Sequence, residues 1–168
     1  SFGERLASGG VTAGLALEPL IRWVRPDIGR ELADRRAAVE GLARWGASRP
    51  PGPLVWLHGA SAGELLGAAP AIDALRARRD FQLLVTHFSP SGRNALDQLG
   101  PEYASYPPLD RRRECDTALG AVRPDLLVFA KLDVWPNLVS AAVRAGSAIA
   151  LINGTVRDGS RRSRPLSR

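Results

Sequence analysis

The stretch "LVWLHGASAGEL", residues 54–65, decides the fold expected for this chain. Its first half is a continuous apolar run, typical of a strand buried on both faces of a parallel sheet. Its second half places only small side chains between His58 and Glu64, which permits a tight turn and close approach of backbone to a ligand. A helix is expected to begin near Gly63, where free N–H groups favour an anion.

Further apolar runs repeat this pattern along the chain. Strands are expected at "FQLLVTHF" (81–88), "DLLVFA" (125–130) and "SAIALIN" (147–153), with a weaker one at "EYASY" (102–106). Helical stretches fill the gaps, at about 64–78, 91–99, 110–121 and 136–145, and Pro70 is expected to end or kink the first after at most two turns. Strands alternating with helices predict an α/β, Rossmann-like parallel sheet flanked by helices.

The chain is expected to contain two regions. Residues 1–49 read as a helical N-terminal extension, and "ASRPPGP" (47–53) is a Pro/Gly hinge after it. Residues 50–168 then carry the Rossmann-like domain. Neither region contains 18 consecutive apolar residues, so no segment is expected to span a bilayer by itself.

Composition narrows the possible function classes. The chain has 168 residues, 45% hydrophobic and 24% charged, which are the proportions of an ordinary globular protein. Cys115 is the only cysteine, which excludes an internal disulfide framework and a Cys-rich metal site, and no metal or cofactor is expected. The net charge of +6 favours anionic partners such as phosphates or anionic lipid headgroups. A nucleic-acid partner is not expected, because no recognisable nucleic-acid motif is present.

Four loops are expected to meet where the parallel strands end, since ligands of such sheets bind outside the carboxyl ends of the strands. They are "HGASAGE" (58–64), "SPSG" (89–92), "KLDVWPN" (131–137) and "NGTVRDG" (153–159). In the first, Glu64 either stabilises the helix N-terminus by its charge or acts as a general base toward a hydroxyl. His58 is either a hydrogen-bonded structural residue or part of the site.

The other loops also leave alternatives open. Ser91 could cap the following helix, while Gly92 could let a ligand approach. Trp135 is either a core side chain or a face on which a sugar stacks, between the polar residues Asp133 and Asn137. The arginines of the final segment, which include Arg161 and Arg162, either form a solvated tail or grip phosphate.

Taken together, these segments resemble one family, the Kdo transferases, which build the inner core of lipopolysaccharide. The family pattern has a strand ending in His followed by "xxSxGE", a "TPTG"-like loop, a "PLD" step, "RPDLLV", "E-T-E-x-WPN" and an Asn- and Arg-containing segment after the fifth strand. The matching segments are "HGASAGE", "SPSG", "PPLD" (107–110), "RPDLLVF" (123–129), "KLDVWPN" and "NGTVRDGSRRSR" (153–164). Their order and spacing hold over nearly all of residues 14–164.

The resemblance implies the N-terminal half of a GT-B glycosyltransferase. That half binds the acceptor, a lipid A precursor, and a C-terminal half, expected to be absent from this chain, binds the donor CMP-Kdo. Glu64 falls on the family's general base. The implied substrate-binding residues are His58, Ser61, Gly63, Ser91, Gly92, Asp133, Trp135, Asn137, Asn153, Arg161 and Arg162. The implied location is the cytoplasmic face of the inner membrane, with the full-length protein peripheral or N-terminally anchored to the anionic surface.

The sequence departs from the family pattern at one loop, where "E-T-E" has become Lys131-Leu132-Asp133. One carboxylate is thus a lysine and another is shortened, which puts the identity of the acceptor in question. Two other functions stay open: another GT-B or sugar-nucleotide enzyme such as a relative of the 2-epimerases, or a non-catalytic basic binding module.

Overall fold

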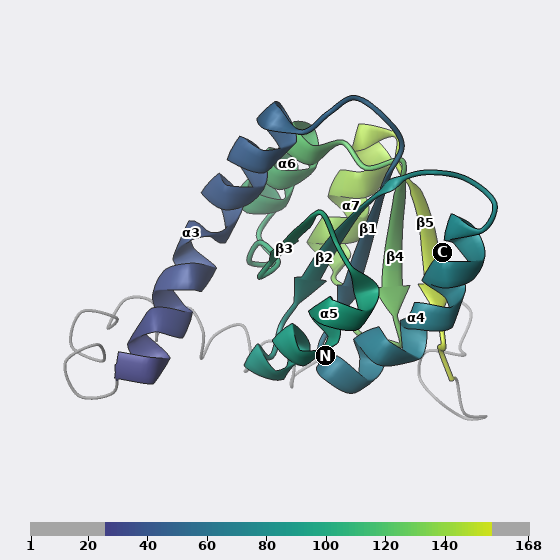
Figure 1. Cartoon of the computed structure of the whole chain (residues 1–168). Coiled ribbons are helices and arrows are strands. Elements are labelled where there is room, and N and C mark those ends of the chain that lie inside the picture. Colours follow the sequence, from purple (N-terminus) through teal and green to yellow (C-terminus); the bar gives the residue numbers. More distant parts are fainter. Residues whose placement is uncertain (1–25, 156–168) are drawn as a thin grey trace, which may run out of the picture.

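Five parallel strands form one sheet in the computed structural model, which describes residues 26–155, with side chains described from residue 33 onward (Figure 1). The strands are β1 (Leu54–Gly59), β2 (Gln82–His87), β3 (Tyr103–Ser105), β4 (Leu126–Ala130) and β5 (Ala148–Ile152). Their order across the sheet is β3-β2-β1-β4-β5, and every neighbouring pair is parallel. The structure confirms the predicted α/β fold, including the weaker strand at β3. The predicted burial of the strand at 147–153 is wrong, because β5 lies at the edge of the sheet and Ile149 and Leu151 are exposed.

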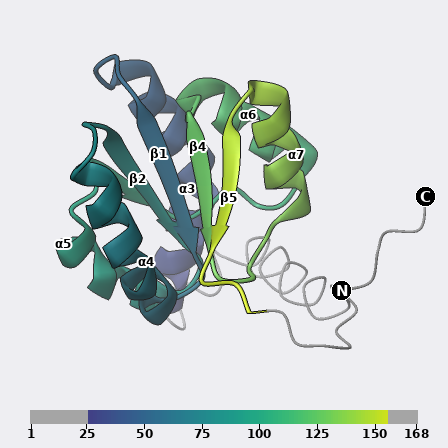
Figure 2. The same ribbon diagram turned by 90° about the vertical axis from the view of Figure 1, so that its right-hand side faces the viewer.

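Helices cover both faces of the sheet (Figures 1 and 2). One face carries α4 (Ala62–Arg76), the 3-10 helix η1 (Pro90–Ala95) and α5 (Leu96–Leu99). The opposite face carries α3 (Pro26–Ser48), α6 (Arg112–Val122) and α7 (Pro136–Ala145). The predicted helices are confirmed, except that the stretch 91–99 divides into η1 and α5.

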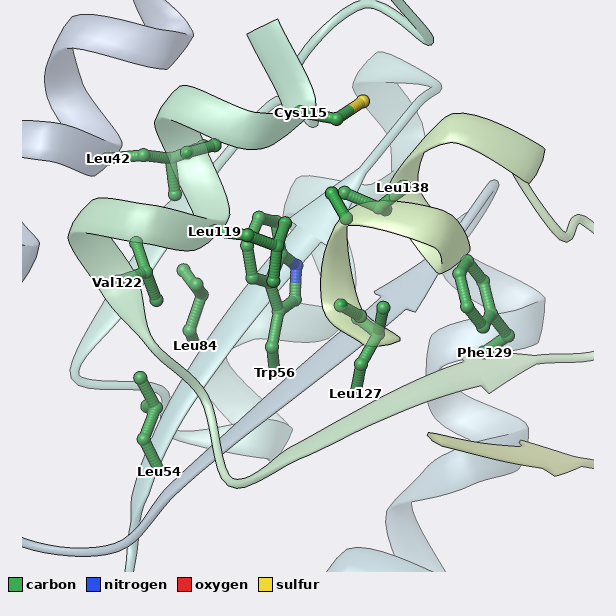
Figure 3. Packing of buried hydrophobic residues seen from close by; sticks show 13 residues of the cluster. Leu42, Leu54, Trp56, Leu84, Cys115, Leu119, Val122, Leu127, Phe129 and Leu138 are labelled. Carbon is green, nitrogen blue, oxygen red and sulfur yellow. The ribbon is translucent and has the colours of Figure 1, made fainter. Parts of the chain in front are cut away.

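Alternation along the strands divides the core between these two faces. In β1, Leu54 and Trp56 pack toward α3, α6 and α7, whereas Val55 and Leu57 pack toward α4 and α5. All four side chains are at most 5% exposed, which explains why the run is apolar without interruption. Figure 3 shows the part of the core that faces α3, α6 and α7, with Trp56 of β1, Leu119 of α6 and Leu127 of β4.

Of the two outcomes predicted at Pro70, an end of the helix is wrong, because α4 continues for 15 residues from Ala62 to Arg76. Proline lacks the N–H that would bond the carbonyl of Leu66. Both Pro70 and Leu66 are exposed, so water can satisfy this carbonyl. The face of α4 that packs on the sheet instead carries Leu65, Ala68, Ala69 and Ile72, which are buried.

Helix α3 packs directly on the Rossmann-like domain, alongside α6 (Figure 1). Leu42 is fully buried in the core cluster, and the ring of Trp45 stacks on Tyr103 with centroids 5.2 Å apart. Gly46 allows close approach to the backbone of α6: a Cβ built there would lie 2.6 Å from the carbonyl oxygen of Ala121. The described part of the predicted extension therefore contributes to the same core as the sheet.

Asp110 organises the start of α7. Its Oδ1 accepts hydrogen bonds from the backbone N–H groups of Asn137 (2.9 Å) and Leu138 (3.1 Å), and its backbone carbonyl accepts one from Asn137 Nδ2 (2.8 Å). These bonds satisfy N–H groups that a helix leaves unpaired at its N-terminus.

Burial, together with Asp110, Glu114 and another carboxylate nearby, raises the pKa of the Cys115 thiol to about 12.

Replacing Gly46 with Ala is expected to destabilise the protein by about 1–3 kcal/mol, because the new methyl group overlaps the backbone of α6. The matched control is Gly120→Ala on α6, where an added Cβ meets nothing within 4 Å. That control should stabilise by up to about 1 kcal/mol, since Ala favours helix more than Gly. Urea unfolding of both variants measures the difference, and equal stabilities would contradict the close α3–α6 packing.

Cys115 should make stability depend on pH above about 9, the ordinary pKa of its thiol. The native state retains the proton up to about pH 12 while the unfolded state releases it, so stability present below pH 9 is lost as pH rises. Between pH 8 and 10 the free energy of unfolding should fall by about 1 kcal/mol more in the native sequence than in Cys115→Ala. Parallel pH profiles of the two proteins would refute the buried thiol's role.

Candidate functional site at the carboxyl edge of the sheet

The first two predicted loops touch where β1 and β2 end. The two strands pair in register up to Gly59 and His87, so both loops leave the sheet at the same level. The backbone N–H of Ser89 then donates to the carbonyl of Ala60 across 2.8 Å. The turn after β1 and the "SPSG" loop are therefore one hydrogen-bonded unit.

The loops after β4 and β5 join the same edge. The ring of Trp135 lies edge-on to Phe88, with centroids 5.6 Å apart, which brings the β4 loop against the β2 loop. Lys131 N–H donates to the carbonyl of Ile152 at 2.7 Å, and Asn153 Nδ2 donates to the carbonyl of Gly67 in α4 at 2.8 Å. The first three loops are thus linked by direct contacts, and the described start of the fourth loop, residues 153–155, is held at the same edge by its bond to α4.

Glu64 lies in the first turn of α4, and its side chain turns back over the preceding loop. Its Oε2 accepts a hydrogen bond from the backbone N–H of Ala60 at 2.7 Å. Ser61 is the N-cap residue but makes no capping bond with its side chain, so Glu64 supplies the carboxylate at this helix end. The side chain remains partly exposed. The arrangement is compatible with a structural role for Glu64 at the helix N-terminus, and it also keeps a carboxylate at the edge of the site.

Gly63 leaves this turn accessible at one position. A Cβ added at Gly63 would meet no atom within 4 Å, and the residue is exposed. The position therefore has space around it among the described residues. Gly59, by contrast, is needed for packing, because a Cβ there would lie 2.8 Å from the side chain of Leu65.

His58 is fully buried at the end of β1. Its Nδ1 lies 3.0 Å from the hydroxyl of Thr86, and its Nε2 lies 3.6 Å from Oδ2 of Asp133. The rings of Phe129 and Trp135 contact it edge-on, with centroids 5.9 and 5.4 Å away. This burial favours the structural reading of His58, while Asp133, whose side chain is 33% exposed, reaches the surface of the site.

The "SPSG" loop differs from its predicted geometry in two respects. Ser89, not Ser91, is the N-cap, and its hydroxyl accepts from the backbone N–H of Ser91 at 3.4 Å. Gly92 is buried against His87, since an added Cβ would lie 2.3 Å from the Cβ of that histidine. The absence of a side chain at Gly92 is thus required by packing within the protein, where the sequence suggested close approach of a ligand.

His87 is the last residue of β2 and is almost fully buried. Burial is the main cause that lowers its pKa, and the nearby Arg93 and Arg35 lower it further, against the hydrogen bond with the Ser89 carbonyl, which raises it. Its ring contacts Tyr106 edge-on, with centroids 4.9 Å apart. The ring is therefore held neutral inside the second loop.

The polar residues of the β4 loop differ in whether they bond within the protein or stay exposed. Asn137 is engaged with Asp110 at the start of α7, as described above. Trp135 is partly buried and packs against the core on the α6 and α7 side of the sheet. Lys131 adopts a left-handed backbone with φ of 68° and keeps its side chain exposed. Arg161 and Arg162 lie outside the described residues, so their predicted role stays a prediction.

Two residues that support this edge were missed by the sequence-based reading. The guanidinium of Arg35 in α3 lies 4.5 Å from the ring centroid of Phe88 and 4.3 Å from that of Tyr106, and it donates to the Phe88 carbonyl. Its position in the sequence could have indicated burial, since helical spacing places Arg35 on the same face as the buried Ala38 and Leu42. Thr86 was missed because it lies within the mainly apolar run 81–88 and was assigned to the strand alone. Among residues 33–155, whose side chains are described, there is no cluster of three metal-ligating side chains.

Comparison with known proteins agrees with this architecture. A family model described as 3-deoxy-D-manno-octulosonic-acid transferase (kdotransferase) matches residues 32–167. The 3-deoxy-D-manno-octulosonic acid transferase of Chlamydia pneumoniae is 34% identical over 134 residues, which cover 74% of this chain and 31% of that protein. The probable mitochondrial 3-deoxy-D-manno-octulosonic acid transferase of Arabidopsis thaliana is 30% identical over 129 residues, covering 71% of this chain and 29% of that protein.

A solved structure, described as the crystal structure of UDP-N-acetylglucosamine 2-epimerase, superposes with a TM-score of 0.50 at 17% identity, over 67% of this chain and 36% of that one. This likeness concerns the fold alone. The chain spans about three tenths of the length of the two transferases above. Because the family model covers most of its residues, the chain belongs to the 3-deoxy-D-manno-octulosonic acid (Kdo) transferase family.

Proposed function

We propose that this chain is the acceptor-binding domain of a glycosyltransferase that transfers Kdo from CMP-Kdo to a lipid A precursor. Membership of the Kdo transferase family supports the transfer of Kdo. The observation that carries the proposal is the Glu64 carboxylate, held by Ala60 at the edge where four loops meet. A second, donor-binding domain is required for turnover, so the chain alone is expected to bind acceptor without catalysing transfer.

In this proposal Glu64 acts as the general base. Its carboxylate takes the proton from a hydroxyl of the acceptor sugar as the oxygen attacks the anomeric carbon of Kdo. The bond from that carbon to the phosphate of CMP breaks, and CMP leaves with the bonding electron pair. The hydrogen bond from Ala60 fixes the direction of the carboxylate, and the small side chains before it leave space for the acceptor.

The family pattern has two carboxylates in the β4 loop, and this sequence keeps only the second, as Asp133, because the first position is Lys131. Lys131 serves the fold with its backbone, and its exposed side chain adds a positive charge suited to a phosphorylated acceptor. Asp133 keeps a carboxylate beside His58. We therefore expect an anionic glycolipid as acceptor, presented at an anionic membrane surface.

Within residues 26–155, no helix has the length and apolar character needed to cross a bilayer.

Replacing Glu64 with Gln in the full-length enzyme should lower kcat by about 10²–10⁴-fold with little change in the KM for acceptor. Glutamine retains an oxygen that accepts from Ala60 N–H, so the loop should keep its shape while the base is lost. Asp73→Asn, an exposed acidic position later in α4, is the matched control and should retain activity. Full activity of Glu64→Gln would restrict Glu64 to a structural role.

The donor can be tested separately. Full-length enzyme supplied with a lipid A precursor should release CMP from CMP-Kdo and should not consume UDP-sugars under the same conditions. Mass spectrometry of the lipid product should show the mass added by one or more Kdo residues. Turnover of a UDP-sugar with no reaction of CMP-Kdo would replace this proposal with that of a different sugar-nucleotide enzyme.

A further inference from the structure

A chain of buried polar side chains runs from the core to the edge of the site. Trp56 Nε1 donates to the Thr86 hydroxyl at 2.8 Å, and this hydroxyl lies 3.0 Å from Nδ1 of His58. Nε2 on the other side of the imidazole lies 3.6 Å from Oδ2 of Asp133. The first three side chains are completely buried, whereas Asp133 is partly exposed.

Strand pairing creates this chain. His58 and Thr86 are direct partners in the β1–β2 register, and Trp56 lies two residues earlier on the same face of β1. Asp133 comes from the loop after β4, the strand on the other side of β1. The four residues therefore meet at the point where the strand order reverses, which is where open α/β sheets bind ligands.

Counting donors and acceptors decides the tautomer of His58. The indole of Trp56 can only donate, so Thr86 Oγ1 must accept from it. The hydroxyl proton then needs an acceptor in a buried environment, and Nδ1 of His58 is the acceptor that the described structure provides. An Nδ1 that accepts leaves the proton of the neutral ring on Nε2. That atom is buried and has no hydrogen-bond partner within bonding distance among the described residues.

We infer that Thr86 is a positioning residue that holds His58 as a donor at Nε2, aimed at the carboxylate of Asp133. The role of Asp133 toward an acceptor hydroxyl rests on the function proposed above, whereas the tautomer does not. An imidazole with its proton on a buried Nε2 cannot remove a proton from substrate. The chain thus points the Nε2–H of His58 toward Oδ2 of Asp133, 3.6 Å away, and leaves general-base chemistry to Glu64.

The tautomer can be observed directly because the chain has only two histidines. Long-range ¹H–¹⁵N spectra of the ¹⁵N-histidine-labelled 168-residue protein at pH 8 should show His58 protonated at Nε2 alone, with His87→Gln used to assign the signals. Asp133→Ala, or Asp133→Asn if that variant is unstable, should retain the same pattern, because Thr86 and not Asp133 sets it. An Nδ1–H or doubly protonated ring in the native protein, or a change of tautomer in the Asp133 variant, would overturn the inference.

Activity of the full-length enzyme provides the second readout. Thr86→Val, which keeps the shape but removes the hydroxyl, should lower kcat by about 10–100-fold with a smaller effect on KM. Thr86→Ser should restore most of the rate, since it returns the hydroxyl. If Thr86→Val unfolds because Trp56 loses its acceptor, the double variant Trp56→Phe/Thr86→Val removes the unpaired donor. Unchanged kcat in the folded variant would overturn the positioning role, whereas an inactive native enzyme with the expected tautomer would count against the proposed function alone.

Discussion

The parallel pairing of β1 between β2 and β4 is the constraint on which the rest of this protein depends. Parallel strands end at the same edge of a sheet, so residues distant in sequence are delivered to one place. β1 lies in the middle of the order β3-β2-β1-β4-β5, and the chain reverses its direction of travel across the sheet beside it. The turn that carries Glu64 therefore emerges at the centre of the carboxyl edge.

The residues by which this sequence resembles the family pattern divide into two groups by what they touch. Gly92, Asp110 and Asn137 hold loops and helix ends in place through packing and hydrogen bonds within the protein. Glu64 and Asp133 keep carboxylates at the partly exposed edge. The first group fixes the backbone on which the second is displayed. This division explains why the fold is compatible with a lysine at position 131, since its backbone N–H supports the sheet while its side chain is exposed.

Helix α3 is connected to this edge through aromatic rings. Arg35 contacts Phe88, Phe88 contacts Trp135, and Trp135 contacts the ring of His58. A fully buried cation would be costly, but here the guanidinium donates to a carbonyl and lies over two rings, which offset its desolvation. The described part of the N-terminal region thus supports the second loop and belongs to the architecture of the site.

The sequence by itself determined the elements of the sheet, because mainly apolar runs alternate along the chain with helical stretches and with turns of small or polar residues. The helix end expected at Pro70 and the cap considered at Ser91 are not found, because the Leu66 carbonyl is on an exposed residue and the neighbouring Ser89 caps η1. Only the tertiary structure decided the strand order, the burial of His58 and its contacts with Thr86 and Asp133. These depend on pairing between distant strands, and residue periodicity along one chain carries no information about which strands become neighbours.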